Sequence, residues 1–260
     1  LAFDPDSARV DAVKAGRLGL HEPGLADLLE DRSGRLAWTA DAADLARADV
    51  VFLTCDVPVT AAGDSDLSAV EALLDTVIPA LSASALLVVQ SQVPPGFTRG
   101  LDIAHDRLFY QVETLVFGEA VARAAEPPVL IVGKADPTRA VPPTYNAVLS
   151  AFDCPRFEMG YESAELAKIS INALLAASLG MANTLAELGE AVGASWDEIE
   201  PVLRSDPRIG PKAYVKAGLG IGGGNIGRDL TTIRKLASAS GTDARVVPAF
   251  WKNSARPRDW

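Results

Sequence analysis

Hydrophobic and polar positions follow two different periods along residues 1–133. Short apolar runs rich in Val, Ile and Leu are separated by segments whose apolar residues recur at helical spacing. Because parallel strands are buried on both faces and are joined by helices, this order predicts βαβ units around a mostly parallel, doubly wound sheet. The predicted strands are 1–3, 36–39, 50–54, 86–89, 108–110 and 129–132, and the predicted helices are 7–14, 25–30, 41–46 and 68–81.

The pattern changes after Asp136. Pro142 and Pro143 interrupt the apolar spacing, and one further short strand is predicted at 156–159. Residues 163–192 then contain no proline and are dense in Ala, Leu and Glu, so they predict a single helix of roughly 30 residues. A helix of this length is expected to cross a whole domain and to pack on both sides.

Two polar positions mark the expected starts of later helices. Ser195 followed by Glu198 matches a capping box, and Asp229 is placed to begin another helix. We therefore expect a Rossmann-like domain at 1–135 and a mainly helical domain at 136–260. A helical second domain of this kind commonly carries substrate contacts or a dimer interface.

The composition is that of a globular chain with an acidic surface. Hydrophobic residues make up 48% of the 260 residues, and acidic residues spread along the chain give a formal net charge of −10. This charge would repel a phosphate backbone, so nucleic acid is not expected as a partner. No stretch approaches roughly 20 uninterrupted apolar residues, and the first residues lack the order of a signal peptide. We therefore expect no membrane association and a cytoplasmic location.

The two cysteines, Cys55 and Cys154, have neither the spacing of a disulfide framework nor that of a zinc site. Each is interpreted as a small buried apolar residue rather than a reactive thiol. No metal site is expected.

The most unusual segment is the glycine-rich sequence GLGIGGGNIGRDL at 218–230. Glycines cost conformational entropy in a helix or strand, so they indicate a place where the backbone approaches another group closely. A surface linker and a ligand-binding loop explain the glycines about equally well. The exit into Arg228 and Asp229 at a predicted helix start favours the ligand loop, because backbone N–H groups there attract anions such as phosphates.

Glu165, Lys168 and Asn172 lie three and four residues apart on the predicted long helix, so they share one face. On the sequence alone, a solvated charged stripe with a Glu–Lys pair is the favoured interpretation, since surface pairs of this kind are common. A buried lysine beside an amide would instead stabilise an oxyanion or act as a base.

Two strand ends carry weaker signals. Asp4 closes the first predicted strand, where an acidic residue of a Rossmann domain would accept the ribose hydroxyls of NAD. An ordinary helix N-cap would give the same pattern. The sequence SQVPPG at 91–96 closes another strand and predicts a rigid turn.

Taken in order, these motifs resemble the UDP-glucose/GDP-mannose dehydrogenase family across nearly the whole chain. The matching segments are FDPD at 3–6, EPGL at 22–25, GDSDLS at 63–68, SQVPPG at 91–96, VETL at 112–115, AELAKISIN at 164–172, DPRIG at 206–210 and GIGGGNIGRDL at 220–230. In the family, VETL reads PEFL, SQVPPG reads STVPxG, and the last segment reads GYGGSCFPKDL. The shared order of the matches is far more specific than any single motif.

The resemblance implies an activity. The family oxidises the C6 hydroxyl of a nucleotide sugar to a carboxylate with two NAD molecules in succession, and its cysteine captures the intermediate aldehyde on the way to a thioester. Asn225 stands at the cysteine position, and an amide cannot add to an aldehyde in this way. We therefore expect an NAD-dependent oxidoreductase that acts on a nucleotide sugar, most simply a UDP-sugar, and stops after one two-electron oxidation.

The resemblance also implies roles for individual residues. Lys168, Asn172 and Asp229 match the family's residues that hold a water or the developing alkoxide near C6, and Glu113 matches a glutamate assigned a general acid/base role. The implied catalytic set is Lys168, Asn172, Asp229, Glu113 and Asn225; the implied cofactor set is Asp4, Pro58, Ser91, Gln92 and Arg228; the implied substrate set is Leu115, Tyr214, Gly222 and Gly223.

Several positions depart from the family's pattern. Gln92 replaces a threonine, Phe117 a glutamate and Arg228 a lysine. Asp56 and Val57 stand where the family has the Gly-Thr of a turn near the cofactor, and an added carboxylate close to a pyrophosphate is unfavourable. These changes motivate an alternative, a catalytically inactive homologue that acts as a binding or assembly protein. A third hypothesis is that the lysine and carboxylates serve a different reaction on a nucleotide-linked sugar.

The family's GxGxxG turn precedes the strand that ends at Asp4, and its third domain follows the position of Trp260. We therefore expect the first domain to lack its first strand and glycine turn in this chain, and the second to end at the start of a linker. A homodimer through the helix at 163–192 is also expected.

Overall fold

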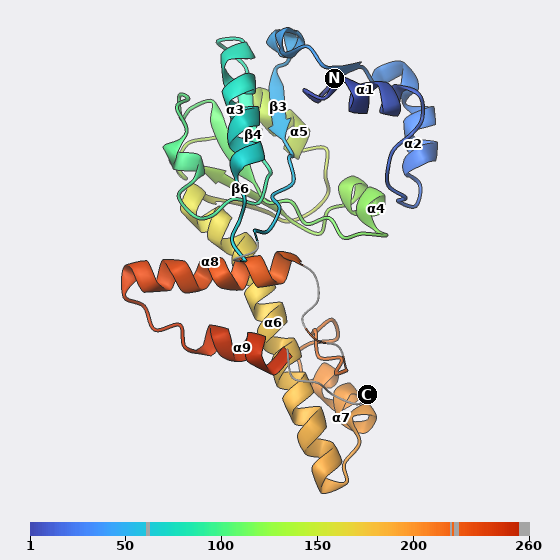
Figure 1. Ribbon diagram of the computed structural model, residues 1–260, viewed down its shortest axis with the longest axis vertical. Helices are drawn as coiled ribbons and strands as arrows, with labels where there is room; N and C mark the ends of the chain where they lie inside the picture. Colours follow the sequence, from blue (N-terminus) through green and yellow to red (C-terminus); the bar gives the residue numbers. More distant parts are fainter. Residues whose placement is uncertain (61–62, 219, 221–223, 255–260) are drawn as a thin grey trace. The chain divides into compact units, whose positions relative to one another are not determined.

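The computed structural model describes residues 1–60, 63–218, 220 and 224–254 (Figure 1). The chain divides into two compact units: an α/β unit of Leu1–Val57 and Leu67–Leu166, and a helical unit of Pro58–Asp66 and Ala167–Trp260. The predicted order of a doubly wound sheet followed by a helical domain with one long helix is confirmed. The sequence placed the division after residue 135, whereas the α/β unit continues through one more strand to Leu166.

A five-stranded sheet forms the centre of the α/β unit. Its strands, in spatial order, are β3 (Val50–Leu53), β4 (Leu86–Val89), β5 (Leu108–Gln111), β6 (Leu130–Lys134) and β7 (Arg156–Gly160). Neighbouring strands are parallel except β5 and β6, which are antiparallel. The carboxyl ends of β3, β4 and β5 therefore share one edge of the sheet, while β6 ends at the opposite edge.

Both faces of this sheet are covered by helices. The α/β unit contains α1 (Ser7–Lys14), α2 (Leu25–Asp31), α3 (Ser68–Ala80), α4 (Ala120–Ala125) and α5 (Pro143–Leu149), with 3-10 segments η1 (Ser33–Arg35), η2 (Ala42–Arg47) and η3 (Thr98–Gly100). Leu87 and Val89 of β4 pack in the core with α3, whereas Leu86 and Val88 pack with α5. Side chains alternate across a strand, so the wholly apolar β4 is buried on both sides.

The first part of the chain differs from the sequence prediction in two details. The short strands β1 (Ala2–Phe3) and β2 (Trp38–Thr39) pair in parallel as a separate two-stranded sheet. The segment predicted as a helix at 41–46 forms the 3-10 segment η2, in which Asp41 caps the first turn by accepting from the N–H of Ala43 at 2.9 Å.

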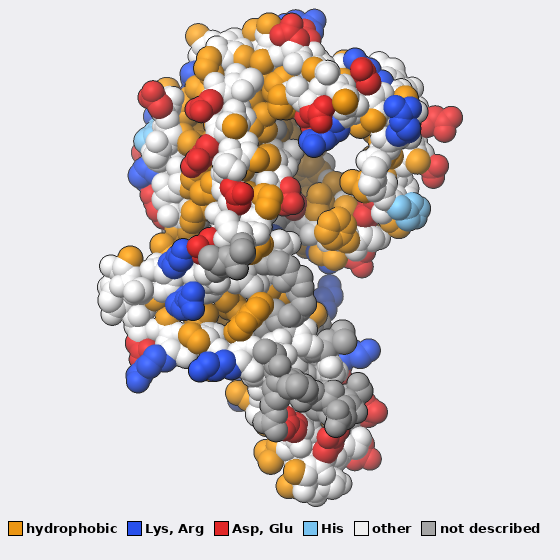
Figure 2. Space-filling view, viewed as in Figure 1, with side chains coloured by type: hydrophobic (Ala, Val, Ile, Leu, Met, Phe, Trp, Pro, Cys, Tyr) orange, Lys and Arg blue, Asp and Glu red, His pale blue; other side chains and the backbone are white. Residues whose placement is uncertain are grey.

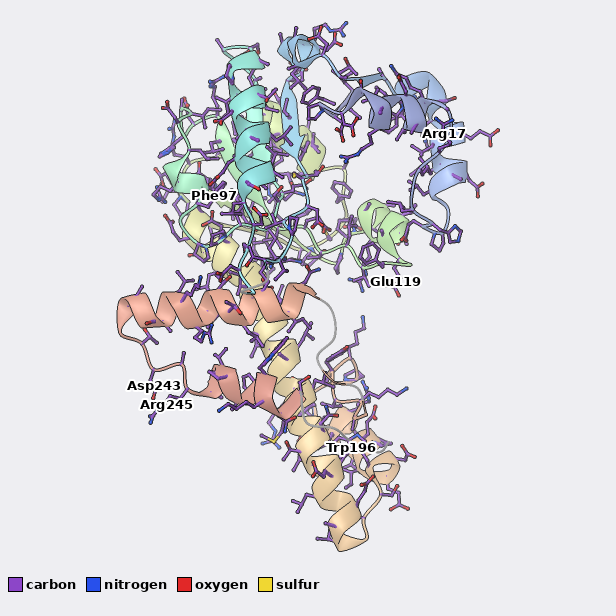
Figure 3. The ribbon with its side chains drawn as sticks, viewed as in Figure 1. Arg17, Phe97, Glu119, Trp196, Asp243 and Arg245 are labelled. Carbon is purple, nitrogen blue, oxygen red and sulfur yellow. The ribbon has the colours of Figure 1, made fainter. Side chains whose placement is uncertain are left out.

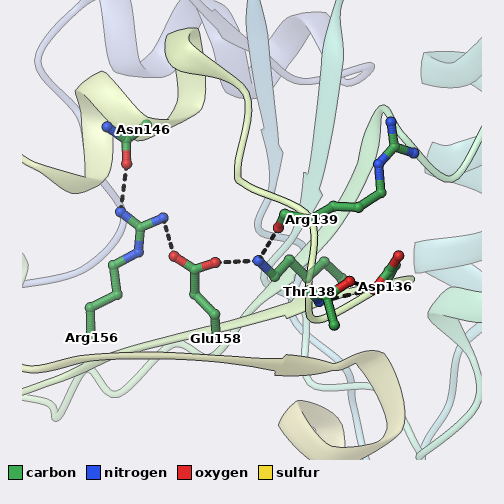
Figure 4. A network of polar contacts seen from close by, with 7 residues as sticks. Asp136, Thr138, Arg139, Asn146, Arg156 and Glu158 are labelled. Atoms are coloured by element: carbon green, nitrogen blue, oxygen red, sulfur yellow. Dashed lines mark hydrogen bonds and ion pairs between the residues drawn. The ribbon is translucent and has the colours of Figure 1, made fainter.

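A chain of ion pairs joins the far edge of the sheet to α5 (Figure 4). Lys134 is only 5% exposed, and its ammonium group contacts Glu158 and the backbone oxygen of Arg139. Glu158 also pairs with Arg156 at 2.6 Å, and Arg156 donates to Asn146 of α5 at 2.7 Å. Burying one lysine is tolerated because its charge is both paired and hydrogen-bonded.

The helical unit is built on α6 (Tyr161–Val192), which confirms the long helix predicted at 163–192. It also contains α7 (Trp196–Ser205), α8 (Gly224–Ser240) and α9 (Val246–Ser254). Ala176 of α6, Leu230 of α8 and Val247 of α9 form its small apolar core. The segment Pro58–Asp66 joins this unit through an ion pair of 2.7 Å between Asp64 and Lys235 of α8.

One predicted helix start is confirmed and one is wrong. Ser195 occupies the N-cap position of α7 as predicted, and Trp196 (Figure 3) is the first helical residue, but the Ser195 side chain makes no capping hydrogen bond within the described residues. Asp229 does not begin a helix: α8 starts at Gly224, so Asp229 lies in its second turn. The sequence pattern did not predict this start, because a glycine-rich segment lacks the periodic apolar residues that indicate a helix.

By length and composition alone, α6 would pass as a membrane-spanning helix. An 18-residue window of it has a mean hydropathy of 1.4, and 39% of that window is buried inside the protein. Core helices of soluble proteins pass the same test. Acidic side chains are scattered over the visible face of the molecule (Figure 2), in keeping with the formal net charge of −10.

Candidate functional site

In the helical unit, Asn172 and Asp229 form a partly buried polar contact between α6 and α8. The side-chain amide of Asn172 donates to Oδ2 of Asp229 at 2.6 Å, and Asp229 is 1% exposed. Lys168 lies one turn before Asn172 on the same face of α6 and is half-buried. The structure thus brings together two of the predicted catalytic residues, Asn172 and Asp229. It places a third, Lys168, on the same face of α6 as Asn172.

The second turn of α8 is unusually charged for a buried segment. Arg228 is 3% exposed, and its Nε lies 3.6 Å from Oδ1 of Asp229. Asn225 lies one turn earlier, on the same helix face as Asp229, and is exposed. The first turn of α8 therefore presents an exposed amide, while the second holds a buried pair of opposite charges.

The glycines of this region serve close packing where the structure describes them. A Cβ atom on Gly220 would lie 3.1 Å from the backbone oxygen of Ser254, and one on Gly227 would lie 2.9 Å from the ring of Trp251. Both neighbours belong to α9, so these two glycines let α9 approach the segment. The predicted substrate residues Gly222 and Gly223 lie outside the described residues.

The solvated charged stripe favoured on the sequence is wrong for Glu165. Its side chain is fully buried, and its carboxylate accepts hydrogen bonds from the backbone N–H groups of Gly96 at 2.6 Å and Thr98 at 2.9 Å. Burial raises the pKa of Glu165, while the hydrogen bonds from Thr98 and Gly96 act in the opposite direction. Glu165 therefore anchors the predicted VPPG turn, in which Gly96 has a φ of 94°.

In the α/β unit, Asp4 ends β1 as predicted. Its Oδ1 accepts from the N–H of Asp6 at 2.9 Å and its Oδ2 pairs with Arg9 at 2.8 Å. The N-cap alternative is wrong for Asp4, because Asp6 is the residue that caps α1. Each oxygen of Asp4 keeps a free acceptor position, and 29% of the side chain is exposed, so the carboxylate fits the ribose hydroxyls of a dinucleotide.

The ends of β3 and β4 meet through a side-chain contact. Ser91 is 3% exposed, and its hydroxyl donates to the backbone oxygen of Cys55 at 2.6 Å. Burial, then the charges of Asp56 and Asp4, raise the pKa of the Cys55 thiol. A thiol held protonated in this way is a poor nucleophile. The carboxylate of Asp56 accepts the N–H of Val57 at 2.9 Å and adds negative charge beside the Cys55 thiol.

The loop after β5 carries Glu113 and Leu115. The carboxylate of Glu113 accepts the backbone N–H of Leu115, so the glutamate turns toward its own loop. Leu115 is 45% exposed and Phe117 is 94% exposed.

The other predicted site residues lie in separate segments and differ in exposure. Pro58 accepts the N–H of Asp66 at 2.9 Å in the helical unit, Gln92 is half-buried after β4, and Tyr214 is 52% exposed. Sequence reasoning missed Arg9, the ion-pair partner of Asp4. A basic residue in the helix that follows an acidic strand end is the signal that could have found it.

Models of one protein family match most of the chain. Residues 1–148 match the NAD binding domain of the UDP-glucose/GDP-mannose dehydrogenase family, and residues 162–253 match its central domain. The first match covers β1 to β6, and the second runs from the start of α6 into α9.

Individual relatives agree with this. UDP-glucose 6-dehydrogenase TuaD of Bacillus subtilis is 28% identical over 98% of the chain, and UDP-glucose 6-dehydrogenase AglM of Haloferax volcanii is 31% identical over 95%. The structure of a UDP-glucose dehydrogenase from Pyrobaculum islandicum superposes with a TM-score of 0.84 at 27% identity and covers 97% of the chain. The chain spans 57%, 61% and 61% of the length of these three proteins, respectively.

Proposed function

Because the chain belongs to the UDP-glucose/GDP-mannose dehydrogenase family, we propose that it acts as an NAD-dependent oxidoreductase on a nucleotide sugar, most simply a UDP-sugar. We further propose that it performs a single two-electron oxidation. The observation that carries this proposal is the partly buried contact between Asn172 and Asp229, with the exposed amide of Asn225 one turn before Asp229.

The chemistry of these residues suits the first oxidation. When bound, NAD supplies the hydride acceptor. A sugar hydroxyl loses its proton and its carbon loses a hydride, so one carbonyl, one NADH and one proton form. Lys168 offers a positive charge to the developing alkoxide, and the pair of Asn172 and Asp229 can hold a water that takes up the proton. Glu113 is proposed as a further acid/base group of the same reaction.

The second oxidation would require a nucleophile that captures the aldehyde. An amide at position 225 cannot form a thioester, and the raised pKa of the Cys55 thiol makes it a poor substitute. Purified full-length protein with NAD and UDP-glucose, or another UDP-sugar that it turns over, is expected to give one NADH per product molecule. The carbonyl product would be trapped with hydroxylamine and identified by mass spectrometry. Two NADH per sugar with an acid product would refute the proposal.

Substitution at position 225 provides a sharper test. Asn225→Cys is expected to raise the yield toward two NADH per sugar, because it supplies the missing thiolate. Asn225→Ser is the matched control, since a hydroxyl at the same exposed position cannot form a thioester. Equal stoichiometry in the two variants would show that position 225 does not limit the reaction.

We propose that Asp4 binds the adenosine ribose of NAD and that Ser91, Gln92, Pro58 and Arg228 belong to the cofactor site. Asp4→Asn is expected to weaken NAD binding about tenfold or more in calorimetry, since a charged acceptor becomes a neutral one. If the wild-type protein binds no NAD, the alternative of an inactive binding or assembly protein is favoured instead.

We also propose that two copies of the chain pair through α6, and that the protein is cytoplasmic. The pairing is supported by a stripe of exposed apolar side chains along α6 that lie three, four or seven residues apart, as in a coiled-coil seam. The stripe consists of Ile171, Leu174, Met181, Leu185, Leu188 and Val192. Apolar residues repeated in this way on a solvent-facing helix require a partner, and a second copy offers a self-complementary one.

Light scattering after size-exclusion chromatography would test the pairing. Leu174→Glu, at a position 69% exposed, is expected to convert a dimer to a monomer without loss of helix content. Val202→Glu is the matched control, because Val202 is 68% exposed on α7 and lies outside the stripe. A monomeric wild-type protein, or a Leu174→Glu variant of unchanged mass, would refute the pairing.

A further inference from the structure

One carboxylate in the α/β unit caps a helix that lies far away in the sequence. Glu22 is 7% exposed, and its two oxygens accept hydrogen bonds from the backbone N–H groups of Gly118 at 2.9 Å and Ala120 at 2.7 Å. These donors lie at the start of α4, where the N-cap residue Glu119 makes no side-chain capping bond. The cap of α4 is thus supplied by a residue 98 positions before Ala120.

The turn that carries Glu22 is itself well ordered. The N–H of Leu25 donates to the backbone oxygen of Glu22 at 3.1 Å, and Gly24 has a φ of 77°, a conformation that favours glycine. A Cβ atom on Gly24 would lie 3.9 Å from Val121 of α4. Gly24 therefore lies near α4, the helix that the Glu22 carboxylate caps.

The segment that this cap holds is the loop after β5. At its start, the N–H of Val112 donates to Ile131 of the sheet at 3.0 Å. At its end it enters α4, which has 6 residues and is too short to be stable without tertiary support. Leu115 and Phe117 between these anchors are exposed. The sheet thus supports the start of this loop, and Glu22 supports its end.

We propose that Glu22 is a positioning residue: it holds the loop that carries Glu113 and Leu115, and so sets how the protein contacts the sugar. This inference rests on the proposed function, because it assigns the loop to the substrate. A carboxylate that accepts two amide N–H groups in a buried position restrains a backbone more strongly than a neutral acceptor does. Loss of the charge therefore loosens the loop while the sheet stays intact.

Hydrogen exchange measures the contact independently of activity. Glu22→Gln is expected to speed exchange at the amides of Gly118 and Ala120 about tenfold, with the amides of β4 unchanged. Glu119→Gln is the matched control: Glu119 extends from the start of α4 (Figure 3), its side chain is 62% exposed, and its carboxylate pairs with Arg123 at 3.0 Å. Unchanged exchange in Glu22→Gln, or equal changes in both variants, would overturn the proposal.

The functional readout separates positioning from stability. Glu22→Gln is expected to raise the KM for UDP-glucose about tenfold while the calorimetric affinity for NAD stays within about twofold. A purely structural role would lower the active fraction and leave KM unchanged, which would overturn the proposal. If the wild-type protein has no turnover, the proposed oxidation fails and the same comparison is made on UDP-glucose affinity by calorimetry. An affinity equal in wild type and Glu22→Gln, or no binding to the wild type, would likewise overturn it.

Discussion

Removing the carboxylate of Glu165 tests how the VPPG turn is held. The side chain is fully buried, and its two oxygens accept the N–H groups of Gly96 at 2.6 Å and Thr98 at 2.9 Å. Each buried N–H left without an acceptor costs about 1–3 kcal/mol, and relief from burying a charge offsets part of that cost. We therefore expect Glu165→Ala to lower the free energy of unfolding by about 3 kcal/mol. Glu165→Gln keeps one acceptor oxygen and should lower it by about 1 kcal/mol.

Urea unfolding followed by circular dichroism would measure both variants. Glu162→Gln is the control on the same helix, because Glu162 pairs with Arg99 but its side chain is 45% exposed, so its loss should cost less than about 1 kcal/mol. A Glu165→Ala variant within about 0.5 kcal/mol of the wild type would refute the reasoning. Such a result would mean that water or another group satisfies the two N–H groups once the carboxylate is gone.

The pH dependence of these two glutamates should have opposite signs. Burial raises the pKa of Glu165 above its ordinary value of 4.5, so its stabilising contribution is full below pH 4.5 and falls as the pH rises through the raised pKa. The hydrogen bond from Arg99 lowers the pKa of Glu162 to about 2 from 4.5, so its contribution is full above pH 4.5 and is lost as the pH falls toward 2. The difference in stability between each Gln variant and the wild type, measured from pH 2 to 7, should show these trends.

Other substitutions probe packing in each unit. A Cβ atom on Gly133 would lie 2.9 Å from Ala164, so Gly133→Ala should lower the free energy of unfolding by about 1–3 kcal/mol through overpacking. A Cβ atom on Gly34 would have no described atom within 4 Å, so the stability of Gly34→Ala should stay within about 0.5 kcal/mol of the wild type. Equal thermal midpoints for the two variants would contradict this reasoning. Asn172→Ala removes a donor 2.6 Å from the buried Asp229 and should cost about 1–3 kcal/mol in urea unfolding. Asn172→Asp should cost more, because two carboxylates would then face each other, and an equal or smaller loss would contradict the contact.

The strands and the long helix could be predicted because their signals are local. The wholly apolar Leu86–Val89 indicated a strand buried on both faces, and the sheet covers it with α3 and α5. The absence of proline from 163–192 indicated a single helix, and α6 spans Tyr161–Val192. Hydrophobic period and proline content act within a few residues of each position, so they can be read without knowledge of the fold.

The polar residues of the candidate site were less predictable. The sequence placed Asn172 and Asp229 in one catalytic set only through a family resemblance, and their hydrogen bond depends on how α6 and α8 pack. It gave Asp229 the wrong place in its helix, because the glycines before it carry no periodic signal. The roles of Glu113, Asn225 and the cofactor residues stay predictions, of which the Asn225 and Asp4 variants test two.

The sequence by itself determined the α/β order, the long helix and the membership of a dehydrogenase family, since these depend on local periodicity and on the order of motifs along the chain. Only the tertiary structure decided what the buried glutamates do. Nothing in the sequence distinguishes Glu22 and Glu165 from glutamates that lie in solvent. In the structure, each accepts two backbone N–H groups from a segment more than 60 residues away. Such contacts follow from the folding of distant segments against each other, and a charge is stable in the interior only where the fold supplies its donors.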